Sequence, residues 1–235
     1  AHPCHGCQDR EAHARWAERY FRAQRQIQDL DRRIATRTHS IARQFDRVCE
    51  TLVDLGYLQG EGDNLQITES GRMLGGLYSE SDLLIAQCLK AGQWNNLQPH
   101  ELAAVVACVV YQSRRSEGDV RPAVPGGPIE SAVDELFRTW ATLSDVERAH
   151  KLGPGPEPDA GLAWAIYRWA KGASLLTILT SNDVSAGDFV RWTRQVIDVL
   201  GQVQQAATDP ALRDIADRAA SAIDRGVVGY APVLE

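Results

Sequence analysis

A stripe of polar side chains recurs within residues 185–207, a stretch with strong helical periodicity. Its members lie three or four residues apart, which places them on one helix face: Arg191, Gln195, Asp198, Gln202 and Gln205, with Arg194 beside them. Amide groups can pair with the edges of nucleobases, and arginine can bind a phosphate or stack on a base. The stripe indicates contacts with successive nucleotides, although an ordinary solvated helix face has the same spacing.

A second face of the same stretch is apolar and predicts a helix that packs along one side. Its members recur at offsets of three and four: Phe189, Trp192, Val196, Val199, Val203 and Ala206. Ile197 and Leu200 widen this face. Ser185, with Asp188 three residues later, is typical of a helix N-cap.

Histidine and cysteine are concentrated in the first seven residues, as His2, Cys4, His5 and Cys7. A Cys-x-x-Cys pair with neighbouring histidines is half of a tetrahedral zinc site. The other three cysteines stand singly on apolar helical faces, where a free thiol packs as a small hydrophobic group. We therefore expect packed or free thiols rather than a structural metal, and assign no metal-binding residue.

The motifs of a self-sufficient active site are missing from the sequence. There is no glycine-rich phosphate-binding loop, GxGxxG, HExxH or GxSxG motif, and the six histidines are scattered. We therefore expect no catalytic residue in this chain. A net charge of −6 also means that any nucleic-acid site must be local or lie in a groove shared with a partner.

The five cysteines of this 235-residue chain do not suggest a disulfide scaffold and indicate a reducing compartment, which we take to be the cytoplasm. The longest apolar run, residues 102–111, is shorter than the roughly 20 residues that span a bilayer. No signal-peptide pattern precedes it. No membrane association is expected.

The whole sequence predicts a mainly α fold. Residues 9–37 have a narrow apolar stripe typical of a stalk-like helix: Trp16, Tyr20 or Phe21, Ile27, Leu30 and Ile34. A second helix is predicted over 39–55, then a short β-hairpin around a glycine-rich turn at 59–64, then a short helix capped by Thr68. Only helices follow, at about 82–91, 99–115, 129–149, 160–171, 173–180, 185–207 and 210–225. The proline- and glycine-rich loops at 116–128 and 151–160 are interpreted as surface insertions.

Several long phrases resemble the C-terminal region of Ski2-like DExH-box helicases of superfamily 2, which includes the DSHCT module. These are GRMLGGLYSESDLLIAQCL, HELAAVVACVVYQSRR, AIYRWAKGASL, AGDFVRWTRQVIDVLGQV and AIDRGVV. HPCHGCQDREAHARW and FDRVCETLVDLGYL look like the actinobacterial HelY-type branch. The resemblance runs from about residue 2 to 231.

The resemblance implies an entry loop and returning stalk helix at 1–37, a winged-helix part at 38–78, and a DSHCT helical bundle at 79–235. In that family, two RecA-like domains hydrolyse ATP, and a ratchet helix of the bundle touches the bases of the translocating strand. The ratchet helix falls on 185–207. The family's base-contacting basic and acidic pair falls on Gln195 and Asp198; Gln195 departs from the arginine of relatives, and Arg191 or Arg194 could supply the charge.

The implied function is the nucleic-acid-gripping module of an ATP-dependent RNA or DNA helicase. The sequence begins without an initiator methionine, so we expect a fragment that neither binds nor hydrolyses ATP alone, with ATP and Mg²⁺ held by the parent core. Expected partners are single-stranded RNA or DNA, the RecA-like domains of the same polypeptide, and RNA-degradation or ribosome-processing proteins. An alternative is a platform that docks a nuclease or ribosomal partner. A winged-helix transcription factor is disfavoured because residues 38–78 lack a cationic recognition helix.

Overall fold

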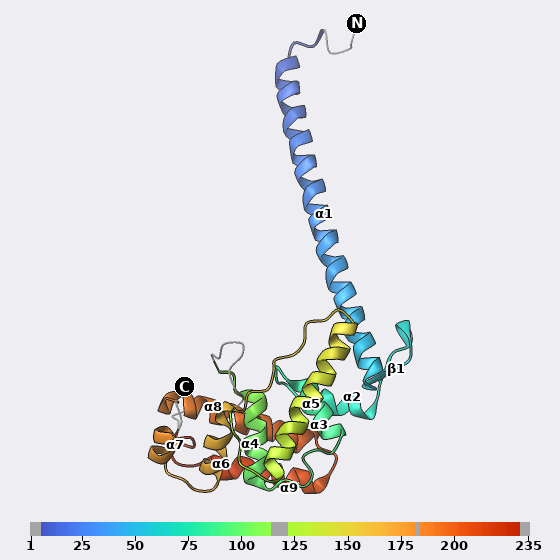
Figure 1. Ribbon diagram of the computed structural model, residues 1–235. Helices are drawn as coiled ribbons and strands as arrows, with labels where there is room; N and C mark the ends of the chain where they lie inside the picture. Colours follow the sequence, from blue (N-terminus) through green and yellow to red (C-terminus); the bar gives the residue numbers. More distant parts are fainter. Residues whose placement is uncertain (1–5, 114–121, 182–183, 231–235) are drawn as a thin grey trace. The chain divides into compact units, whose positions relative to one another are not determined.

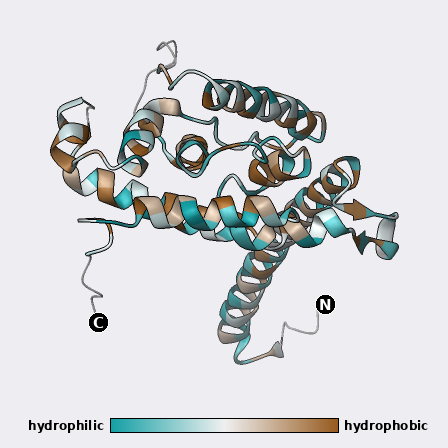
Figure 2. Ribbon diagram, turned by 90° about the horizontal axis from the view of Figure 1, so that it is seen from below, coloured by the Kyte–Doolittle hydropathy of each residue, from teal (hydrophilic) through white to brown (hydrophobic). Residues whose placement is uncertain are grey.

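The computed structural model describes residues 6–113, 122–181 and 184–230, apart from the side chains of 32–40 and 63. It confirms a mainly α-helical protein, in which the described strands form one two-stranded sheet (Figure 1). The helices carry hydrophobic and hydrophilic bands along their length (Figure 2). By contacts between residues, the chain separates into two units, 1–49 and 50–235. The assignment of 38–78 to a winged helix and of 79–235 to a bundle stays a prediction.

Helix α1 runs without interruption over Arg10–Asp54, so the prediction of two helices with a break near residue 38 is wrong. The stretch contains no glycine or proline, and the Thr and Ser residues near the predicted break lower helix propensity only slightly. In the first unit, the large apolar side chains are exposed: Trp16, Tyr20, Phe21, Ile27, Leu30, Ile41 and Phe45. The side chain of Ile34 lies outside the described part.

The second unit opens with the last turn of α1 and the predicted hairpin. Strand β1 (Leu58–Gln59) pairs antiparallel with β2 (Gln66–Ile67), and a 3-10 helix, η2 (Gly62–Asn64), lies in the turn. Helix α2 (Glu69–Leu74) follows at once. It ends earlier than the sequence predicted, and two glycines follow its last residue.

Thr68 joins the hairpin to α2. Its Oγ1 donates to the carbonyl of Gly56 at 2.9 Å and accepts from the backbone N–H of Gly71 at 3.1 Å. The hydroxyl thus caps the helix and holds the start of the hairpin. Residue 71 must be small, because a Cβ there would collide with the carbonyl oxygen of Tyr57.

Helix α4 (Pro99–Val110) is the centre of the second unit and contacts α5, α6, α8 and α9 (Figure 1). All residues from 101 to 109 are buried, so the helix has no long solvent face. The sequence placed its end near 115, but it ends at Val110. The backbone N–H of Asp159 donates to the Cys108 carbonyl at 2.7 Å, which a longer helix would have used for residue 112.

The other helices surround α4. Their bounds are α3 Asp82–Lys90, α5 Pro128–Ala149, η3 Ala160–Leu162, α6 Ala163–Ala170, α7 Leu175–Ser181, α8 Ala186–Ala206 and α9 Pro210–Ile223. Helix α9 also contacts α8 and α6 directly. Helix α8 is therefore supported by two helices along its apolar face.

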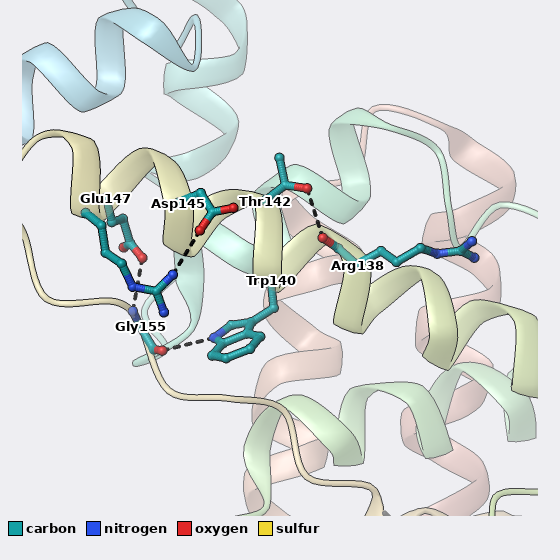
Figure 3. A network of polar contacts seen from close by, with 7 residues as sticks. Arg138, Trp140, Thr142, Asp145, Glu147 and Gly155 are labelled. Carbon is teal, nitrogen blue, oxygen red and sulfur yellow. Dashed lines mark hydrogen bonds and ion pairs between the residues drawn. The ribbon is translucent and has the colours of Figure 1, made fainter.

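The loop between α5 and η3 is fastened to α5 instead of extending freely. The indole Nε1 of Trp140 donates to the carbonyl of Gly155 at 3.0 Å, and the Gly155 N–H donates to Glu147 Oε2 at 3.1 Å (Figure 3). At its far end, Asp159 Oδ2 accepts from the Ser113 N–H at 2.9 Å. The loop that sequence reasoning treated as an insertion is a fixed part of the surface.

Candidate nucleic-acid interface

Helix α8 holds the polar stripe on a rigid support. Ser185 Oγ accepts from the Asp188 N–H at 3.1 Å and donates to Asp188 Oδ2 at 2.9 Å, which confirms the predicted N-cap. The buried face consists of Phe189, Thr193, Val196, Val199, Leu200 and Val203. Thr193 is compatible with that face because its hydroxyl donates to the Phe189 carbonyl at 2.6 Å. The predicted apolar face is confirmed with Thr193 added and with Trp192, Ile197 and Ala206 half-buried.

Three residues of the stripe, Gln195, Asp198 and Gln202, line one hollow of about 370 Å³. We call it the α8 hollow. Its other walls are the loop at residues 78–81, the end of α4 around Val109, and Pro156 from the loop fastened to α5. Elements from four parts of the second unit therefore meet at the stripe.

Gln195 and Asp198 are exposed, and neither side chain makes a hydrogen bond or ion pair with another residue of the described ranges. The two lie three residues apart on one helix face, so their side chains are neighbours. One offers an amide donor and acceptor, the other a carboxylate acceptor. This pair is available to an incoming ligand.

Gln202 is partly engaged. Its Oε1 accepts the backbone N–H of Tyr78 at 2.7 Å, which ties the 78–81 loop to α8. The amide nitrogen is left as the group that can donate to a ligand. Gln202 thus both shapes the hollow and lines it.

Arg191 stands beside the hollow and not in it. Its guanidinium lies 4.4 Å from the centre of the Trp192 ring and forms an ion pair with Asp188 at 3.0 Å. Both members of the pair are more than half exposed, so the pair is weak and open to exchange for a phosphate. Trp192 in turn packs edge-to-face on Tyr111, with ring centres 5.3 Å apart.

Arg194 points to another part of the unit. Its Nε and Nη2 donate to the carbonyl of Val228 at 3.3 and 2.9 Å, and its side chain is half-buried. The structure therefore does not bring Arg194 together with Gln195, Asp198 and Gln202. Its position supports the turn after α9.

Residues 64–231 match the family model of the DSHCT (NUC185) domain, which is most of the chain. The chain belongs to the DSHCT domain family. Both the 78–81 loop and α8 lie inside the matched residues of this DSHCT domain. The walls of the α8 hollow are thus part of the family's domain and not of an addition to it.

Comparison with curated proteins gives the same relationship. The chain is 43% identical to "Probable helicase HelY" of Mycobacterium tuberculosis over 97% of its own length and 26% of the relative's. It is 42% identical to the protein of that name from Mycobacterium leprae, over 90% of this chain and 24% of the relative. Identity to the DExH-box ATP-dependent RNA helicase DExH11 of Arabidopsis thaliana is 25%, over 96% of this chain and 17% of that protein. The chain spans about a quarter of the length of its mycobacterial relatives, and the resemblance to the HelY type is confirmed.

Sequence reasoning missed Tyr78 and Glu80, which line the α8 hollow of the DSHCT domain. Tyr78 is 81% exposed. The available signal was Gly75-Gly76 directly after a short helix, because glycines often end a helix and start a loop. An aromatic residue in that loop, here Tyr78, does not lie on a helix face that packs on the core. That signal says nothing about which element the loop faces.

Cys88, a buried cysteine of the DSHCT domain, is not a reactive thiol. Burial raises the pKa of the Cys88 thiol to about 12, with a smaller effect of Glu135, so it stays protonated and unreactive. Cys7 Sγ lies 3.4 Å from His13 Nδ1. His2, Cys4 and His5 lie outside the described residues, and among the described ones no group of three or more His, Cys, Asp or Glu could hold a metal ion. No described helix is long and apolar enough to cross a bilayer.

Proposed function

We propose that this DSHCT domain grips a single strand of RNA or DNA for an ATP-dependent DExH-box helicase of which the chain is the C-terminal part. In this proposal α8 is the ratchet helix. The supporting observation is the pair Gln195 and Asp198, whose exposed side chains have no partner among the described residues and which lies on a helix with a packed apolar face.

Rigidity of the support is what this function requires. The apolar face of α8 contacts α4 and α9, and Phe189, Val196, Leu200 and Val203 are completely buried. A side chain on such a helix can hold a base in place while other parts of an enzyme move. A good pair of hydrogen bonds to one base edge is worth about 1–3 kcal/mol, enough to bias a step without trapping the strand.

Charge limits what this domain can do alone. The chain carries −6, and Glu80 and Asp198 make the α8 hollow acidic. Base edges, not phosphates, suit the hollow. We propose that phosphates are met by Arg191 and by the RecA-like domains of the same polypeptide, which would also hold ATP and Mg²⁺, and that the enzyme acts in the cytoplasm.

The test is unwinding of a 3′-tailed duplex by the full-length helicase that contains this chain. We expect the double variant Gln195→Ala, Asp198→Ala to unwind at least about 10-fold more slowly, since two base contacts are removed. ATP hydrolysis without a strand should be unchanged. Unaltered unwinding would sink the assignment of α8 as the ratchet helix.

A matched control is available on the same helix. Gln204 Nε2 donates to Asp217 Oδ1 at 3.1 Å between α8 and α9, outside the hollow. The double variant Gln204→Ala, Asp217→Ala removes the same two side-chain types. It should leave unwinding unaffected.

A second role is favoured by the exposed apolar side chains of residues 10–49, among them Trp16, Tyr20 and Phe45. Aromatic groups of this kind are enriched in protein interfaces. They support docking of an RNA-degradation or ribosome-processing protein, such as a nuclease. Trp16→Ser with Tyr20→Ser should then abolish capture of the partner while crosslinking of a strand at Arg191 persists.

A further inference from the structure

Tyr78 has a backbone held in place and an exposed side chain. Leu77, the residue before it, is 3% exposed and anchored in the core, while the Tyr78 N–H is held by Gln202 Oε1 at 2.7 Å. The side chain itself is 81% exposed at the rim of the α8 hollow. Because the backbone of Tyr78 is already held in place, stacking of a flat ligand on its ring costs little backbone entropy.

The α8 hollow has the chemistry of a pocket for one flat, amino-bearing ring. Val109, Val110 and Val199 give it an apolar lining. Asp198 and Glu80 add two carboxylates, which when ionised only accept hydrogen bonds. Its volume of about 370 Å³ lies at the small end of the usual range for ligand pockets, so it suits a single base and not a duplex.

We propose that the α8 hollow takes one nucleobase of the gripped strand, that Tyr78 stacks on that base, and that Asp198 selects bases carrying an amino group. This inference rests on the proposed function and adds base preference to it. Glu80 keeps the rim acidic, so that phosphates stay outside near Arg191.

The donor pattern of the bases sets the expected order. Guanine presents adjacent N1–H and N2–H₂ donors that one carboxylate can accept together, whereas adenine and cytosine present one amino group each. Uracil has no amino group and would bring a carbonyl oxygen against Asp198. Guanine should bind best and uracil worst.

The test uses the whole 235-residue chain and fluorescence anisotropy at low salt with three single-stranded RNAs of equal length: oligouridine, the same strand with guanosine at every third position, and that strand with inosine replacing guanosine. Inosine lacks only the 2-amino group. We expect the guanosine strand to bind about 10-fold more tightly than oligouridine, and the inosine strand to lie between them.

Two variants test the named residues. Asp198→Asn should abolish the preference for guanosine, while Asp214→Asn, an identical charge change on α9, should preserve it. Tyr78→Leu should weaken binding of every strand by about 5–150-fold, as loss of one base-stacking contact does. Tyr230→Leu is its control, because Tyr230 is 87% exposed and lies outside the hollow.

The outcomes separate three claims: the base preference, the stacking role of Tyr78 and the gripping of a strand. Equal binding of the three strands by the wild-type chain overturns the base preference and leaves gripping intact. Unchanged affinity of Tyr78→Leu overturns the stacking role. Absence of binding to all three strands at low salt overturns the gripping function and the inference with it.

Discussion

Arg225 contacts Trp169 at both its ring and its backbone carbonyl. The guanidinium of Arg225 lies 3.6 Å from the centre of the Trp169 ring and donates to the Trp169 carbonyl, and its Nη2 also donates to the Ala173 carbonyl at 2.7 Å. The Trp169 indole N–H donates in turn to the Ile223 carbonyl at 2.8 Å. The carbonyls of Trp169 and Ile223 lie at the C-terminal ends of α6 and α9, so the pair joins the last turns of two helices.

We expect Arg225→Lys to lower the free energy of unfolding by about 1–2 kcal/mol, although the charge is kept. Lysine cannot stack its head group as a plane or reach two carbonyls with one rigid fork. Urea unfolding measures the change. Arg218→Lys is the control, because Arg218 forms an exposed pair with Asp214, and this substitution should change stability by under about 0.5 kcal/mol. Equal effects of the two variants would contradict the role of Arg225.

Gly71→Ala should destabilise the second unit by more than about 2 kcal/mol, because the added methyl group collides with the Tyr57 carbonyl and the backbone must move. Gly201→Ala provides the opposite case. No atom lies within 4 Å of a Cβ at 201, inside α8, so alanine there should stabilise by about 0.5–1 kcal/mol. Thermal unfolding of both variants checks the signs, and a stable Gly71→Ala protein would refute the packing described for α2.

The contact of His150 with the end of α1 should make stability depend on pH. His150 Nε2 lies 2.7 Å from Asp54 Oδ2, and Nδ1 lies 3.4 Å from Glu50 Oε2. Hydrogen bonding to Asp54, and then to Glu50, raises the pKa of His150 above its usual value. Because the folded pKa is raised, this stabilisation is fully present below the unfolded pKa of about 6.5 and is lost as pH rises through the folded pKa.

At pH 5.5, the His150→Gln variant should therefore have a lower melting temperature than the wild type. At pH 8.5, the difference between the two melting temperatures should be smaller. Scanning calorimetry in buffers of equal ionic strength measures it. Asp54→Asn should remove most of the pH dependence, since Asp54 has the larger effect. A difference that is constant with pH would show that the histidine acts through packing alone.

Gln202→Met should release the 78–81 loop while filling similar space. The Tyr78 N–H then loses its acceptor, which lowers stability by about 1 kcal/mol at most because water can replace it. Hydrogen exchange at the Tyr78 amide should become markedly faster. Gln202→Glu keeps an acceptor oxygen and should keep the amide protected. Fast exchange in the wild-type chain would show that the bond to Gln202 does not hold the loop.

Much of the support for the stripe could be predicted from the sequence. The cap at Ser185 follows from the residue types there, and the buried face from Phe189 to Val203 and the exposure of Gln195 and Asp198 follow from periodicity within one helix. Local pattern could not show that Arg194 reaches the Val228 carbonyl, or that Gln202 holds Tyr78 across 124 positions of sequence. Those contacts depend on how the helices pack.

The same limit explains why the α8 hollow could not be predicted. Tyr78, Pro156 and Gln195 come together only through tertiary packing, and no spacing in the sequence connects them. The predicted break in α1 failed for another reason. Thr36, Thr38 and Ser40 are weak helix formers, but without glycine or proline their small penalties do not end a helix.

The enclosure of α4 has a consequence for synthesis of the chain. Residues 101–109 are buried, partly by α8 and α9, whose sequences follow α4 by roughly 75 to 115 positions. At about 5–20 residues per second, a ribosome needs several seconds to some twenty seconds to deliver those helices. During that interval α4 is an apolar segment without its cover. The second unit can close only when its C-terminal helix has emerged, and a nascent chain interrupted before residue 210 would expose its core to chaperones and proteases.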